Sequence, residues 1–141
     1  MINLMEAQSD GEIQRCFPVM KQLRTHLDES DFISRVRRQM TDGFRLGYLE
    51  EDGAVRAVAG FRIYENLSSG KYLYIDDLVT DSDHRSKDFG GNLFAWLVDL
   101  AHTHRCEVLG LDSGVQRFGA HRFYLRKRMD ITSHHFAIRL T

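Results

Sequence analysis

The feature that most constrains the fold is a change of pattern between residues 71 and 105. Residues 71–80 (KYLYIDDLVT) form an extended, mostly apolar run, and residues 83–91 (DHRSKDFGG) are polar and contain two glycines. Residues 91–105 then place apolar side chains at 93, 94, 97, 98, 100 and 101, which is one broad face of a helix. The stretch therefore predicts a strand, a short basic loop and a helix, an order with which protein backbones hold phosphate.

The loop carries groups that suit a bound anion. The first N–H groups of a helix lack partners and carry about half a positive charge. Arg85 and Lys87 add side-chain cations, Ser86 adds a hydroxyl donor, and Gly90 and Gly91 let the backbone approach a ligand closely. Because solvated loops before helices have a similar composition, these residues alone leave both interpretations open.

The rest of the chain predicts one α/β domain over residues 1–141. Periodicity divides it into helices at 12–24 and 30–43, a hairpin at 44–65, a strand at 106–114, a helix at 118–128 and a strand at 130–140. Pro18 is expected to kink the first helix or to mark its restart. The predicted order is therefore ααβββαβαβ, with a mixed sheet.

Composition excludes several classes of function. With 19 basic and 20 acidic residues, the chain has no global positive field for nucleic acid. No apolar run approaches the roughly 20 residues of a membrane span, and the N-terminus lacks the layout of a secretory signal. Cys16 and Cys106 are far apart and are expected to be buried thiols, which favours the cytoplasm. The seven histidines form no ligand spacing, so no metal site is expected.

Two motifs carry a resemblance to a known family. The loop Arg85-Ser86-Lys87-Asp88-Phe89-Gly90 between a strand and a helix is followed about thirty residues later by AHRFYLRKRM. This arrangement resembles the GNAT superfamily of N-acetyltransferases, whose loop reads Arg/Gln-x-x-Gly-x-Gly/Ala. The family's second motif ends in Ala-x-x-x-Tyr-x-x-x-Gly-Phe. Ala120 and Tyr124 match it, while Arg128 and Met129 replace Gly-Phe. The resemblance covers residues 55–140.

The resemblance implies a fold and a co-substrate. The fold would be a GNAT-type mixed, mostly antiparallel twisted sheet flanked by helices, and the co-substrate would be acetyl-CoA. The end of the strand, Leu78, Val79 and Thr80, would contact the pantetheine arm. The pyrophosphate would lie on the loop residues Arg85, Ser86, Lys87, Asp88, Phe89, Gly90 and Gly91.

Asp88 is a departure from the family pattern, because it stands where the first loop glycine is usual. It could cap the following helix, but its carboxylate would also compete with pyrophosphate for the same N–H groups. At an effective dielectric near 20, a like-charge pair about 5 Å apart costs roughly 3 kcal/mol, and far less at a wet surface. We therefore expect Asp88 to turn outward and coenzyme to bind more weakly than with glycine there.

The resemblance also implies catalytic roles. Tyr124 occupies the position of the family's usual general acid, although a packing role on a short helix is the alternative. Asp76 would accept the amine proton through water, and Asp77 would bind a cationic amine, as in the acidic pair of polyamine acetyltransferases. Adjacent strand residues point to opposite faces, so both carboxylates can share a site only if a bulge breaks the alternation. A structural pair of aspartates is the alternative.

The expected function is acetyl transfer from acetyl-CoA to the primary amine of a small molecule. A non-catalytic acyl-CoA-binding sensor of the same fold is the main alternative, and an enzyme that acetylates proteins is a weaker one. The family often dimerises through terminal strands, which makes residues 134–141 a candidate edge for a homodimer. No motif identifies the acceptor amine.

Overall fold

The structure, a computed structural model, describes all 141 residues. The chain forms two compact units, Met1–Gly110 and Leu111–Thr141. The expectation of a single domain over 1–141 stays a prediction. None of the helices combines the length and the apolar character that a membrane-spanning helix needs.

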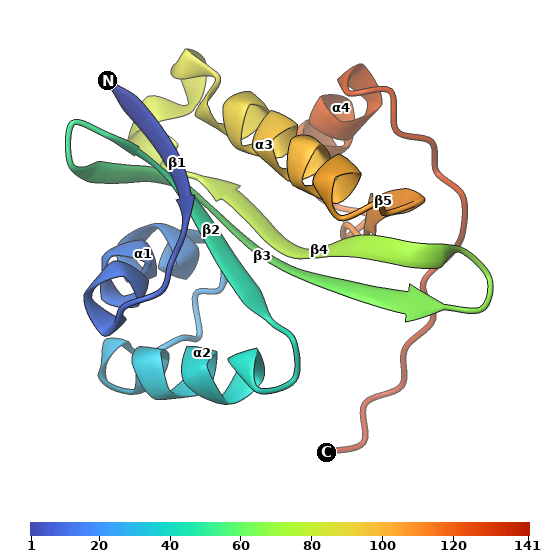
Figure 1. The fold of residues 1–141 in the computed structure, drawn as a ribbon, viewed down its shortest axis with the longest axis horizontal. Coiled ribbons are helices and arrows are strands. Elements are labelled where there is room, and N and C mark those ends of the chain that lie inside the picture. The colour runs from blue at the N-terminus through green and yellow to red at the C-terminus, as the bar shows by residue number, and fades with distance from the viewer. The chain divides into compact units, whose positions relative to one another are not determined.

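A five-stranded sheet organises the larger unit, and its last strand ends at Leu111, the first residue of the smaller unit (Figure 1). Its strands lie in sequence order: β1 (Ile2–Glu6), β2 (Arg45–Glu51), β3 (Ala54–Asn66), β4 (Gly70–Thr80) and β5 (Val108–Leu111). The ladders β1–β2, β2–β3 and β3–β4 are all antiparallel. Helices α1 (Asp10–Leu23) and α2 (Phe32–Met40) cover one face, and α3 (Phe89–Thr103) covers the other. The predicted α/β class, with a mostly antiparallel sheet between helices, is confirmed.

The first helix shows how local sequence fixes an element. Ser9 Oγ accepts a hydrogen bond from the Glu12 N–H, and Glu12 accepts one from the Ser9 N–H, a reciprocal capping box. The helix then continues through Pro18 to Leu23 without a restart. Its inner face buries Ile13 and Cys16 completely, and this burial raises the pKa of the Cys16 thiol to about 12.

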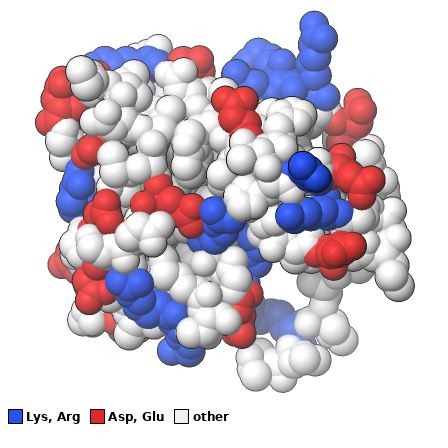
Figure 2. Space-filling view, in the orientation of Figure 1, with Lys and Arg blue, Asp and Glu red and all other residues white.

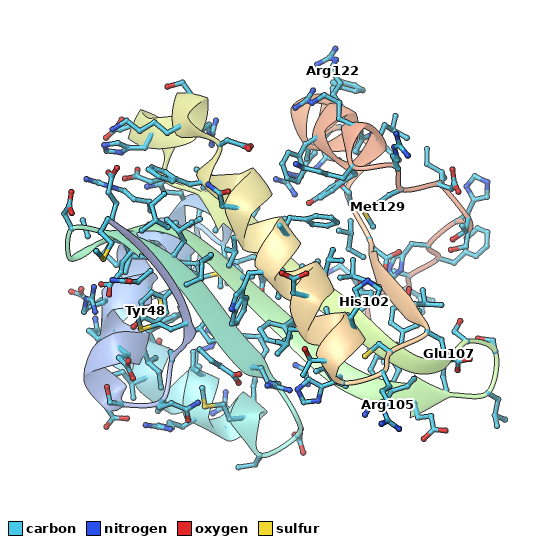
Figure 3. The ribbon with its side chains drawn as sticks, turned by 45° about the horizontal axis from the view of Figure 1, so that its top comes forward. Tyr48, His102, Arg105, Glu107, Arg122 and Met129 are labelled. Carbon is cyan, nitrogen blue, oxygen red and sulfur yellow. The ribbon has the colours of Figure 1, made fainter.

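The main core lies between α1, α2 and the sheet. Tyr48 of β2 points toward α1 (Figure 3), and its hydroxyl donates a hydrogen bond to Glu12 Oε2 at 3.1 Å. The Phe17 and Phe32 rings of the two helices meet edge-on, with centroids 5.2 Å apart. Other fully buried side chains in this cluster are Leu46 and Val58. The core thus anchors both helices against β2 and β3, beside the strand that carries the aspartate pair.

Two elements differ from the predicted order. Residues 2–6 form β1, which the sequence analysis missed, and pair from Ile2↔Glu51 to Glu6↔Gly47. The predicted final strand at 130–140 is wrong, because no strand follows α4 (Phe118–Arg126) in the smaller unit. Alternation makes a strand only when a neighbouring strand accepts its hydrogen bonds, and residues 130–140 have none. The observed order is βααβββαβα.

Candidate active site

A bulge in β4 brings two carboxylates to one place. The register between β3 and β4 pairs Gly60 with Asp77 and Phe61 with Ile75, which leaves Asp76 as the extra residue. This irregularity breaks the alternation that would send neighbouring side chains to opposite faces. The condition set by the sequence analysis is met, since Asp76 and Asp77 both line the same pocket.

The pocket has a volume of about 320 Å³ and belongs entirely to the larger unit. Its walls come from α1, α2, the turns that follow these helices, and strands β2 and β4. Besides the two aspartates it is lined by Met20, Arg24, His26, Leu27, Phe32, Arg35, Val36, Gln39, Phe44 and Leu46. Six of these twelve side chains are apolar and six are polar or charged, so the charged groups have a large share in the chemistry of the pocket.

Both aspartates are held by arginines. Arg24, the residue just after α1, donates from Nε to Asp77 Oδ1 at 2.7 Å and from Nη2 to the Asp76 carbonyl oxygen at 2.9 Å. Arg62 of β3 donates from Nε to Asp76 Oδ2 at 2.9 Å. The second oxygen of the Asp76 carboxylate, Oδ1, has no hydrogen bond within the protein.

Asp77 is the more enclosed of the pair. Its side chain is 12% exposed against 24% for Asp76. Burial raises the pKa of Asp77, and the hydrogen bond from Arg24 opposes that rise without cancelling it. Asp77 Oδ2 lies over Gly60, where a Cβ atom would come within 2.5 Å of this oxygen and 2.6 Å of the Phe44 ring. Gly60 therefore makes room for the Asp77 carboxylate.

A braced turn follows β4. The 3₁₀ segment η2 (Ser82–Lys87) begins after Asp81, whose Oδ1 accepts a hydrogen bond from Gln22 Nε2 at 3.2 Å. Gln22 Oε1 accepts in turn from the Ser82 N–H at 2.9 Å, and Asp81 Oδ2 lies 3.2 Å from His84 Nδ1. Burial raises the pKa of Asp81, but these hydrogen bonds outweigh it and hold the pKa below its usual value. The turn is thus tied to α1 before α3 begins.

The N-terminus of α3 has no side-chain cap, in contrast to α1. Asp88 occupies the capping position in a left-handed conformation (φ 57°, ψ 31°), and its carbonyl accepts the Asn92 N–H at 3.0 Å. Helices leave the N–H groups of their first turn without intrahelical partners. Those of Phe89, Gly90 and Gly91 therefore point out of the helix end as free donors.

The conformation of Asp88 differs from both of the possibilities considered for it, the helix cap and the outward turn. Its side chain does not cap the helix. A capping residue is typically in the extended region, where its side chain can accept hydrogen bonds from the second and third N–H groups of the helix, whereas Asp88 is in the left-handed region. It also does not turn away. A Cβ atom on Gly91 would lie 2.3 Å from Asp88 Oδ1, so the carboxyl leans over the first helical turn, where Gly91 leaves room for it.

The other expected coenzyme residues surround this helix end. Leu78, Val79 and Thr80 are the last residues of β4 and lead directly into the turn. Lys87 Nζ lies 3.9 Å from Glu51 Oε1, and Arg85 and Ser86 are exposed. Figure 2 shows Lys and Arg side chains beside Asp and Glu side chains along this edge of the larger unit. The strand end, the basic turn and the uncapped helix end are therefore contiguous.

Tyr124 lies in the smaller unit, on α4. Burial raises the pKa of its hydroxyl, while the positive charge of the Arg117 guanidinium acts in the opposite direction. Arg117 is the residue immediately before α4. The pairing of Arg24 and Arg62 with the aspartates was not predicted from the sequence. Two carboxylates on a strand do call for cationic partners, but no spacing in the sequence indicates which arginines supply them.

Comparisons with known proteins identify the family of the chain. The model of the acetyltransferase (GNAT) family matches residues 11–129. The uncharacterised N-acetyltransferase YhdJ of Bacillus subtilis is 34% identical over 128 residues, which is 90% of each chain.

Two solved structures share the fold. A GNAT family acetyltransferase of Staphylococcus aureus has a TM-score of 0.83 at 17% identity, covering 99% of this chain and 98% of its own. The aminoglycoside N-acetyltransferase AAC(6')-Iy, solved in complex with CoA, has a TM-score of 0.85 at 12% identity, covering 99% and 94%. The resemblance, the acyltransferase class and acetyl-CoA as co-substrate are confirmed. The chain belongs to the acetyltransferase (GNAT) family.

Proposed function

We propose that the protein transfers the acetyl group of acetyl-CoA to the primary amine of a small molecule. The observation that carries this proposal is the uncapped N-terminus of α3 directly after the basic turn Ser82–Lys87. Free N–H groups, a positive helix end and nearby cations together suit a diphosphate. The main chain of Leu78–Thr80, one step earlier in the chain, would hold the pantetheine arm.

Removal of the amine proton falls to the aspartate pair. Asp76 acts as the base through a water molecule, because Arg62 engages only one of its carboxylate oxygens. The more enclosed Asp77, fixed by Arg24, orients the amine. Once this proton has passed from the ammonium to Asp76, the free amine attacks the thioester carbonyl, so that a C–N bond forms, the C–S bond breaks, and the nitrogen loses its second proton through water to the solvent.

The departing thiolate needs a proton. Tyr124 supplies it as the general acid and regains a proton from the solvent, and the positive charge of Arg117 opposes the rise in the pKa of its hydroxyl that burial causes. The products are an acetamide and CoA with a free thiol. A pocket of about 320 Å³ is at the small end for ligand sites, which supports a small acceptor over a protein side chain on a large surface.

The test is release of CoA thiol in the presence of acetyl-CoA and a panel of small amines. For the wild type we expect saturable release of thiol that depends on the amine. For Asp76→Asn we expect the rate to rise more steeply toward alkaline pH, because the amine must then lose its proton in solution. If Asp77→Asn shows this change and Asp76→Asn keeps the wild-type profile, the two roles are reversed. Saturable binding of acetyl-CoA without thiol release from any amine would favour the sensor alternative.

Two further parts of the proposal concern the setting of the enzyme. Both cysteines are free, which supports a reducing compartment such as the cytoplasm. The apolar side chains of Phe136, Ile138 and Leu140 alternate along the C-terminal segment and are 90%, 84% and 89% exposed. This pattern supports a homodimer in which the segment pairs as a strand with a second copy. Light scattering that gives a monomer at high protein concentration would refute the dimer.

A further inference from the structure

The pocket that contains Asp76 and Asp77, taken with the arginines paired to these residues, holds more positive than negative side chains. Its two carboxylates, Asp76 and Asp77, are each paired with an arginine, Arg62 and Arg24 respectively. Each guanidinium offsets the charge of its carboxylate, although Asp76 Oδ1 stays free to accept a hydrogen bond from the amine. The pair therefore does not make the pocket an anionic site, although the sequence DD suggests one.

Arg35 is an additional cation in the same pocket. It lies on α2, one turn from Phe32 and Gln39, and all three side chains line the pocket from one helix face. Arg35 is half-buried and makes no hydrogen bond or ion pair with any residue of the chain. By contrast Arg37, two positions further along α2, donates a hydrogen bond from Nη2 to Asp10 Oδ1 at 2.8 Å.

We propose that the acceptor carries an acidic group, a carboxylate or a phosphonate, in addition to its amine, and that Arg35 binds this acidic group. This inference rests on the proposed function and specifies its substrate class. With two carboxylates against Arg24, Arg35 and Arg62, the ionised groups of the site sum to one positive charge. That balance suits an amino acid or an aminophosphonate, whose amine would lie by the aspartates and whose anion would face α2.

The same balance disfavours a diamine or polyamine acceptor. The second ammonium group of such a molecule would approach the unpaired guanidinium of Arg35, and the two positive charges would repel each other. A carboxylate or phosphonate in the same place would instead accept two parallel hydrogen bonds from the planar guanidinium. The specificity suggested by the resemblance to polyamine acetyltransferases is therefore not what this pocket supports.

The experiment compares primary amines of equal length that differ only at the far end. Butylamine, 1,4-diaminobutane, 4-aminobutyrate and 3-aminopropylphosphonate are each assayed for kcat/KM of thiol release, and their binding to the CoA complex is measured by calorimetry. We expect the two anionic amines to exceed butylamine by about tenfold or more, with 1,4-diaminobutane the poorest. The ratio of carboxylate to phosphonate distinguishes the two acidic groups.

Arg35→Gln is expected to raise KM for the anionic amines about tenfold, with kcat and the values for butylamine changed less than twofold. Arg35→Lys should restore part of the preference, because it keeps the charge. Arg38→Gln is the matched control, since Arg38 lies on the same helix but is exposed and does not line the pocket. A loss of similar size for anionic and neutral amines in Arg35→Gln would overturn the inference.

The proposed function and the inference fail in different ways. If no amine supports thiol release, the proposed function fails, while calorimetry still decides whether the pocket prefers anionic amines. If butylamine or 1,4-diaminobutane is acetylated or bound best, the inference is wrong and the acetyltransferase function stands.

Discussion

The position of Asp88 gives a quantitative prediction for coenzyme binding. Its carboxyl leans over Gly91, at the helix end where the diphosphate is proposed to lie, and its side chain is exposed. For charges about 5 Å apart, water-like screening gives roughly 1 kcal/mol of repulsion per charge pair, against roughly 3 kcal/mol at an effective dielectric of 20. The exposure of Asp88 favours the lower value, so removing its charge should tighten CoA binding about fivefold.

Two substitutions separate charge from backbone conformation. Asp88→Asn removes the charge and keeps a residue that tolerates the left-handed conformation, so it measures the electrostatic effect alone. Asp88→Gly should show the same tighter binding and also stabilise the fold by up to about 1 kcal/mol, because glycine adopts a positive φ without steric cost. Asp83→Asn, in the same turn, is the control and should change CoA binding much less.

The assay is calorimetric titration of CoA at two salt concentrations. The gain in Asp88→Asn should shrink as ionic strength rises, because the Debye length falls from about 10 Å at 0.1 M salt to about 3 Å at 1 M. Unchanged or weaker CoA binding in both Asp88 variants at low salt would refute the placement of the diphosphate at this helix end.

Three other predictions follow from the contacts. Tyr124→Phe should lower kcat by about ten- to ten-thousand-fold if Tyr124 is the acid, with an unchanged melting temperature, and an unchanged kcat would eliminate that role. Hydrogen bonds from the N–H groups of Ser9 and Gln8 lower the pKa of Glu12 from 4.5 to about 2. The ionised Glu12 carboxylate therefore stabilises the fold fully above pH 4.5, and this stabilisation is lost as the pH falls toward 2. The urea midpoints of wild type and Glu12→Gln should converge over that pH range, and a constant difference between them would contradict the prediction. Gly60→Ala should cost about 1–3 kcal/mol of stability through overpacking and impair turnover, whereas Gly11→Ala, with only Ser9 Oγ at 3.9 Å, should do neither.

Local patterns predicted most of the fold. The helical spacing of α1, α2 and α3 and the alternation of β2 to β4 are strong because each element buries one face. The strand β1 escaped notice because five residues offer too short a pattern, and its place in the sheet depends on pairing with β2 far along the chain. The strand predicted at 130–140 is wrong for the opposite reason: the alternation of its side chains is clear, but no neighbouring strand accepts its hydrogen bonds.

The site was predictable only where a single stretch of chain builds it. The turn from Thr80 to Gly91 is local, and its composition led to the prediction of an anion site, which stays a prediction. The pocket depends on contacts between distant residues, such as Arg24 with Asp77, which the sequence separates by 53 positions. The unpaired charge of Arg35 could not be recognised without knowing which arginines the aspartates already occupy.

The most direct test of the account is whether the turn and the end of α3 bind the diphosphate of the coenzyme. We would titrate the full chain with CoA and, separately, with pantetheine, which has the same thiol arm and no diphosphate. The account predicts saturable CoA binding that weakens with salt, and pantetheine binding at least a hundredfold weaker. Equal binding of the two compounds, or no saturable heat with CoA up to millimolar concentration, would contradict it.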